Sequence, residues 1–81
     1  ITKDGLTEDH IAYLKSIYDL GGTAGVENLM NHSGRPKEII YEVEKLLIDR
    51  HYVEIGKRGR TLMAPGAVAL RKAIPTIKDN K

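Results

Sequence analysis

The apolar positions at the start of the chain recur at helical spacing. Thr7 is a good N-cap residue, and carboxylates follow it at Glu8 and Asp9, where they favour the positive end of the helix dipole. The apolar residues that come next share one helical face: Ile11, Leu14, Ile17 and Tyr18. These signals predict a helix over residues 8–20, which Gly21-Gly22 ends.

Two further helices are predicted before residue 51. Thr23-Ala24 is expected to form a short extended piece, and Gly25 opens a second helix that ends near residues 32–34. Pro36 suits a helix start because the first turn does not need its missing N–H, and a third helix is predicted from there to about Arg50. The apolar residues of this third helix form one continuous stripe: Ile39, Ile40, Val43, Leu46 and Leu47.

After the third helix the apolar period changes from helical to alternating. Two alternating stretches, 52–55 and 61–64, flank the polar stretch 56–60, which indicates a β-hairpin. Pro65 breaks the second strand, and a last short helical pattern precedes the polar tail at 79–81, which is expected to be mobile. The order of helix, small strand, two helices and hairpin is that of the winged variant of the helix-turn-helix.

Composition agrees with one small folded domain. Of the 81 residues, 41% are hydrophobic and 30% are charged, which is ordinary for a globular domain and unlike a disordered chain. We therefore expect residues 1–81 to form a single, mainly α winged helix-turn-helix domain with three helices, a wing hairpin and a short C-terminal helix. The chain begins at Ile1 rather than at methionine, so we expect it to be a piece of a larger protein.

Several function classes are excluded by what the sequence lacks. It has no cysteine, and its three histidines lie on different predicted elements, so no recognisable zinc pattern is present. The glycine-rich pieces do not match a phosphate-binding loop, and no nucleophile elbow occurs. No apolar run is long enough to span a bilayer, and no signal pattern opens the chain. We expect a cytoplasmic domain with no catalytic residue, metal or cofactor of its own and no membrane partner.

The net charge of +2 is small, but the charges are unevenly distributed. Two of the 13 basic residues fall within residues 1–33, whereas the other eleven fall within residues 34–81, where six acidic residues oppose them. The carboxyl half is therefore expected to carry the positive face of the domain.

The polar stretch of the predicted hairpin combines two glycines with three cations. The glycines let the backbone turn tightly, so Lys57, Arg58 and Arg60 are expected to project toward phosphates or a narrow minor groove. A charge run can also be a solvated loop, but its position on the wing favours DNA contact.

The third helix would be the recognition helix of this motif. Arg35 and Lys37 at its amino end, with Tyr41 one turn later, are candidate DNA contacts. Carboxylates spread along the rest of the helix would repel phosphates: Glu38, Glu42, Glu44 and Asp49. Strong base readout by this helix is therefore not expected, and the wing is the main candidate contact.

Four motifs resemble one family: Asp4-Gly5-Leu6-Thr7, Gly21-Gly22 followed by Gly25-Val26 and Leu29, Leu47-Ile48 to Tyr52-Val53, and Arg58-Gly59-Arg60. In these motifs the chain resembles the carboxyl-terminal winged-helix domain of RuvB, the bacterial motor of Holliday-junction branch migration. The likeness spans roughly residues 5–70, and the Arg-Gly-Arg wing is its most distinctive part.

The resemblance implies a parent protein that is a ring-forming AAA+ ATPase of recombination and repair. ATP and Mg²⁺ would belong to the motor domains, which with their hexamer would be partners of this domain, and the domain would grip double-stranded or junction DNA. Arg58 and Arg60 would lie at the DNA backbone or minor groove, with no strong sequence preference. Leu46 and Lys57 stand where the family commonly has proline, so the helix end and the wing shape can differ.

Two alternatives remain open from the sequence. The first is a transcription regulator that reads base sequence with the third helix. The second is a winged helix used for protein contact, in which the apolar wing strands or the region of Val68, Leu70 and Ile74 dock a partner.

Overall fold

A computed structural model describes residues 5–74 of the chain. The tail at 79–81, for which mobility was expected, lies outside these residues. The elements along the chain are α1 (Glu8–Asp19), β1 (Thr23–Ala24), α2 (Val26–Ser33), α3 (Lys37–Asp49), β2 (Val53–Gly56), β3 (Gly59–Leu62) and α4 (Ala64–Ala73). Their order is the predicted one, and the ends of α1, α2 and α3 differ from the prediction by one or two residues. The second strand was predicted over 61–64 with Pro65 as its breaker, but it ends at Leu62, and Pro65 lies in the first turn of α4, where a helix tolerates proline.

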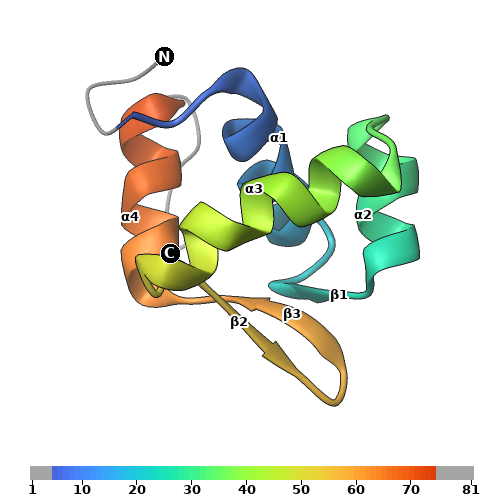
Figure 1. Ribbon diagram of the computed structural model, residues 1–81. Coiled ribbons are helices and arrows are strands. Elements are labelled where there is room, and N and C mark those ends of the chain that lie inside the picture. Colours follow the sequence, from blue (N-terminus) through green and yellow to red (C-terminus); the bar gives the residue numbers. More distant parts are fainter. Residues whose placement is uncertain (1–4, 75–81) are drawn as a thin grey trace.

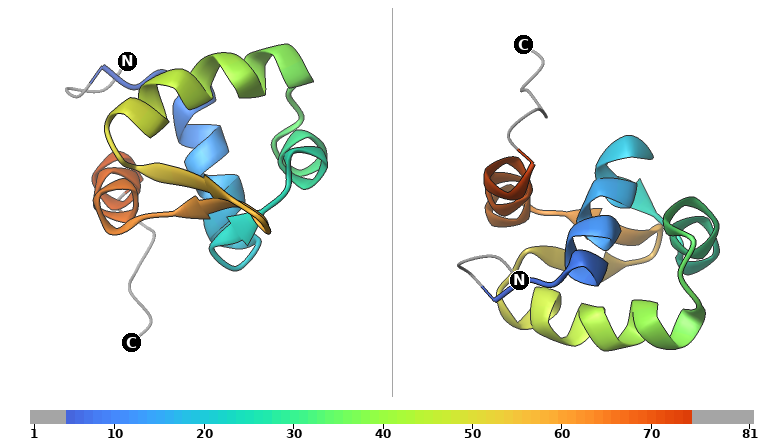
Figure 2. Two further views of the ribbon diagram at one scale, coloured as in Figure 1. Left: turned by 60° about the horizontal axis from the view of Figure 1, so that its bottom comes forward. Right: turned by 90° about the horizontal axis from the view of Figure 1, so that it is seen from above.

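Helix α1 lies at the centre of the domain. It packs against α2, α3, α4 and β3, and its side chains Tyr13, Leu14 and Ile17 are completely buried (Figures 1 and 2). Each of the other helices adds to the core from one face, for example with Leu29 of α2 and Leu70 of α4. Leu6, Ala24 of β1 and Val53 of β2 are also part of the core. This one-sided burial is what the helical spacing of apolar residues predicts.

A capping box fixes the start of α1. Thr7 is the N-cap residue, and its backbone N–H donates a hydrogen bond of 3.0 Å to Nδ1 of His10, the third residue of the helix. The Thr7 hydroxyl lies 2.8 Å from the same ring nitrogen. His10 thus takes the place that Glu or Gln usually holds in a capping box. Its Nδ1 must carry no proton to accept the bond from the Thr7 N–H.

The three strands form one antiparallel sheet with β3 in the middle, in the order β1-β3-β2. Thr23 of β1 pairs with Thr61 of β3, and the hairpin closes at the pair Gly56 and Gly59. The turn is therefore only Lys57-Arg58, shorter than the predicted polar stretch 56–60. Arg60 consequently lies within β3, opposite Ala24 and Ile55, and not at the tip of the wing.

Gly59 is required where it stands. Its φ of +117° is a conformation that side-chain-bearing residues rarely adopt, and a Cβ there would press into the backbone carbonyl of Ala24. The wing can approach β1 this closely only because Gly59 has no side chain.

We predict that Gly59→Ala lowers the free energy of unfolding by about 1–3 kcal/mol, because it adds backbone strain and a steric contact. Gly56→Ala is the matched control: Gly56 has ordinary φ and open space around it, so its substitution should change stability by less than about 0.5 kcal/mol. Urea denaturation followed by circular dichroism measures both variants. Equal effects of the two substitutions would show that the close approach to β1 does not matter.

We also predict a pH dependence of stability that comes from His10. Burial lowers the pKa of His10 from its usual 6.5; Asp9 opposes this shift, and Arg50 adds to it. As the pH falls below 6.5, the unfolded chain binds a proton at His10 before the folded chain does, so the free energy of unfolding falls with pH. His10→Gln keeps an acceptor for the Thr7 N–H but does not titrate, and its stability should fall less over that range in urea titrations. The remaining histidines are the same in both proteins, so identical pH profiles would contradict the assignment.

Candidate nucleic-acid interface

Four cations in residues 5–74 are exposed and take part in no ion pair: Lys37, Lys57, Arg58 and Lys72. Lys57 and Arg58 form the turn of the wing, and Lys37 is the first residue of α3. The wing turn and the amino end of α3 lie on the same side of the domain, whereas α4, which carries Lys72, lies on the opposite side (Figures 1 and 2). Three free positive charges are thus presented on one side.

Arg60 faces inward. Its Nε and Nη2 donate hydrogen bonds to the two carboxylate oxygens of Glu44 on α3, and the side chain of Arg60 is 15% exposed. The Tyr13 hydroxyl of α1 donates a third hydrogen bond, of 2.8 Å, to Glu44 Oε2. This differs from the expectation that all three wing cations project toward phosphates, because the shorter turn places Arg60 in a strand facing the helices.

Within this Tyr13–Glu44–Arg60 cluster, burial and hydrogen bonds to Glu44 shift the pKa values of Tyr13 and Arg60. Burial, followed by the bond to Glu44 and its charge, raises the pKa of Tyr13 well above the usual range, so the hydroxyl stays protonated and remains a donor. The hydrogen bond to Glu44 raises the pKa of Arg60, so the guanidinium stays charged. Both donors to Glu44, the Tyr13 hydroxyl and the Arg60 guanidinium, therefore keep their protons over the whole physiological range.

Sequence reasoning treated Glu44 as a surface carboxylate of the recognition helix and did not single out Tyr13. Glu44 is 7% exposed, so it does not contribute to repulsion of phosphates. One signal was available: Glu44 stands four residues after Ile40 and three before Leu47, which places it on the buried face of α3. An acidic residue at such a position requires a cationic or hydrogen-bonding partner.

The two remaining candidates near the start of α3 have different surroundings. The side chain of Arg35 is 30% exposed. Its Nε donates a hydrogen bond of 2.8 Å to Oδ1 of Asp9 in α1, and its Nη1 donates one to the carbonyl of Ser33. Tyr41 is 45% exposed on the outer face of α3. Arg35 therefore has its charge matched within the domain, whereas Tyr41 is accessible to a partner.

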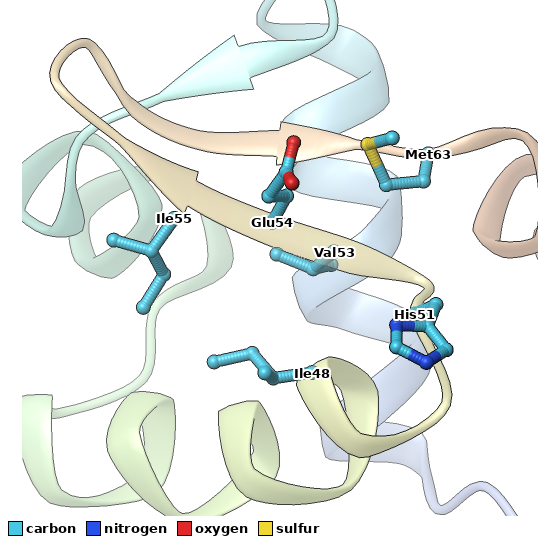
Figure 3. A pocket seen from close by; sticks show the side chains of 6 residues that line it. All are labelled: Ile48, His51, Val53, Glu54, Ile55 and Met63. Atoms are coloured by element: carbon cyan, nitrogen blue, oxygen red, sulfur yellow. The ribbon is translucent and has the colours of Figure 1, made fainter.

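An apolar groove separates α3 from the wing. It has a volume of about 390 Å³ and is lined by Ile48, His51, Val53, Glu54, Ile55 and Met63. Ile48 of α3 and Ile55 of β2 lie on its two sides and are 38% and 49% exposed (Figure 3). The exposed carboxylates of α3, Glu38, Glu42 and Asp49, are not among the residues that line the groove, so Glu54 is the carboxylate in its lining.

Two further observations limit what the described part of the chain can do. No group of three or more His, Cys, Asp or Glu side chains there could hold a metal ion. None of the helices in residues 5–74 has the length and apolar character needed to cross a membrane.

A three-helix core with a helix-turn-helix and a β-hairpin wing defines the class of winged-helix domains. The sequence model of the RuvB C-terminal winged helix domain matches residues 3–71. The chain therefore belongs to the RuvB C-terminal winged helix domain family.

Comparison with other proteins supports the fold. A solved structure of Bordetella bronchiseptica BpsR, a protein whose DNA binding is regulated by 6-hydroxynicotinic acid, has the same fold with a TM-score of 0.81 and 18% identity. The match covers 93% of this chain, and it covers only 58% of the BpsR chain. A comparison with curated proteins finds no match.

We predict that Glu44→Ala lowers the free energy of unfolding by about 3 kcal/mol, because it leaves a largely buried guanidinium and a buried hydroxyl without a partner. Glu42→Ala is the matched control on the same helix. The Glu42 side chain is 71% exposed, and its Oε1 lies 3.6 Å from Nζ of Lys45, so this substitution should lower the free energy of unfolding by less than about 0.5 kcal/mol. Urea denaturation measures both variants. Similar costs at the two positions would refute the account of the buried cluster.

Proposed function

We propose that this domain binds duplex DNA with little sequence preference, through the wing turn and the amino end of α3. The observation that carries the proposal is that Lys57 and Arg58 form an exposed two-residue turn with no internal partner. Cations held in this way can approach phosphates without breaking an existing ion pair, so their binding energy is not offset by a loss within the protein.

Lys37 supports the same surface from α3. It lies in the first turn of the helix, where the backbone N–H groups also favour an anion. Arg35 is a weaker candidate because phosphate contact would compete with Asp9, and Tyr41 can add a neutral contact beside Lys37. The exposed carboxylates of α3, Glu38, Glu42 and Asp49, disfavour close contact of the whole helix with a major groove.

Family membership supports a further step for the parent protein. We infer that the domain anchors an ATP-driven motor of Holliday-junction branch migration to DNA, in recombination and repair. In this proposal the AAA+ motor domains, with their ATP and Mg²⁺, are partners of the domain. A contact that grips the backbone without reading bases suits a motor, because the contact must be made at every sequence that passes.

We predict that duplex binding by the chain weakens with salt, with a slope of log affinity against log salt of about −3 for three phosphate contacts. Substituting both Lys57→Ala and Arg58→Ala should lower affinity at least tenfold and reduce the slope by about 2, since two contacts are lost. Fluorescence anisotropy with a labelled duplex at several salt concentrations measures both quantities. Competition by a duplex of random sequence and by a four-way junction, each unlabelled, reports sequence and shape preference.

Lys72→Ala is the control for this titration, because it removes one exposed charge from α4 on the opposite side of the domain. It should leave the slope unchanged. If the wing double substitution has no larger effect than Lys72→Ala, the wing is not the DNA contact. If random duplex competes far less well than one particular sequence, the chain is a sequence-specific regulator instead.

The apolar groove favours a second candidate function, contact with a protein partner. The groove runs between Ile48 and Ile55, at the wing strands that the sequence analysis named as one docking region. In the other region Leu70 is completely buried, but Val68 is 43% exposed, and Ile74 lines a second hollow of about 380 Å³ between α1 and the end of α4. This candidate function predicts that the chain has little affinity for duplex DNA at physiological salt. The same titration therefore separates the two functions.

A further inference from the structure

Arg60 connects the wing to two helices through one carboxylate. Its Nε and Nη2 bind the two oxygens of Glu44, with 3.3 Å between Nη2 and Oε1, and Tyr13 donates to the same carboxylate. Within residues 5–74 no buried side-chain nitrogen or oxygen lacks a hydrogen-bond partner. The cluster thus joins α1, α3 and β3 in a fully satisfied arrangement.

Moving Arg60 to a phosphate would leave Glu44 in an unfavourable state. The carboxylate is 7% exposed and would keep only the Tyr13 hydroxyl as a donor. A largely buried charge without its counter-ion is strongly unfavourable, so the phosphate contact would have to compensate for this loss. Arg58, two residues earlier, can reach a phosphate at no such cost because it is exposed and unpaired.

The end of the wing has no other polar anchor to the helices. Beyond the pair of Ile55 and Arg60 there are only Gly56, the exposed turn 57–58 and Gly59. Glycines contribute no side chain, and Ile55 is half exposed beside the groove. Gly59 lies against the backbone of Ala24 in β1, so the link from the turn to the helices runs through the side chain of Arg60.

We propose that Arg60 is a positioning residue of the wing: its fork-like pairing with Glu44 orients the hairpin so that Lys57 and Arg58 meet DNA, and Arg60 itself touches no phosphate. The proposal rests on the proposed function for its DNA readouts. It changes the role of one of the three wing cations from ligand contact to internal support.

Arg60→Lys and Arg58→Lys form a matched pair of conservative substitutions. Lysine keeps the charge but cannot bind both carboxylate oxygens, whereas a phosphate accepts either side chain as a positive charge. We expect Arg60→Lys to lower duplex affinity about five- to tenfold with an unchanged salt slope, and Arg58→Lys to change affinity less than about twofold. If Arg60→Lys behaves like Arg58→Lys, the proposal is overturned.

The double variant Glu44→Gln with Arg60→Gln provides a second test at constant net charge. The two amides can hydrogen-bond to each other, so the wing keeps a link to α3 although no guanidinium is present. We expect its salt slope to equal that of the unsubstituted chain and its affinity to stay within about threefold. A slope reduced by about 0.9, the value for one lost phosphate contact, would overturn the proposal.

Hydrogen exchange of the free chain tests the positioning role without DNA. Amides of residues 53–62 should exchange about tenfold faster in Arg60→Lys than in Arg58→Lys, while those of α2 exchange at the same rate in both. Equal exchange in the hairpin would overturn the proposal whatever the DNA results. If the unsubstituted chain binds no duplex, the proposed function fails, and the exchange rates still decide whether Arg60 holds the wing.

Discussion

The carboxylate of Glu44 is almost completely removed from water, and the arrangement of three elements follows from the need to satisfy it. Tyr13 reaches it from α1, and Arg60 reaches it from β3. Replacing such a cluster with apolar side chains often costs no stability, so we infer that its contribution is geometric. It fixes the direction of β3, and with it the wing, relative to α1 and α3.

The same pairing decides which positive charges are available to a partner. Two of the candidate arginines, Arg35 and Arg60, are matched by carboxylates within the domain. Lys37, Lys57 and Arg58 remain free on one side of the molecule, which is a local concentration of charge that the net value of +2 does not reveal. Local potential, more than net charge, governs how a small domain meets a phosphate backbone.

The geometry of the wing and of α3 also bears on the kind of recognition that the domain can achieve. The wing turn projects beyond the groove between α3 and β2, and the residues that line that groove include Ile48, Ile55 and Glu54. Contacts at the wing turn and at the amino end of α3, with an apolar groove between them, fit binding of the phosphate backbone better than base readout. The proposed motor context requires the same property, since the contact has to tolerate any sequence.

The sequence by itself determined the order of helices and strands, the winged-helix class and the cations at the wing turn. These features depend on local signals: apolar period, caps and turn residues act over a few positions along the chain. Only the tertiary structure decided the partners of Arg35, Arg60 and Glu44, because the paired residues are far apart in the sequence. Arg35 and Asp9 are 26 positions apart, Arg60 and Glu44 are 16 apart, and Tyr13 and Glu44 are 31 apart. A charge pattern does not show which distant charges meet. Folding brings them together, and burial then makes the pairing of Glu44 obligatory.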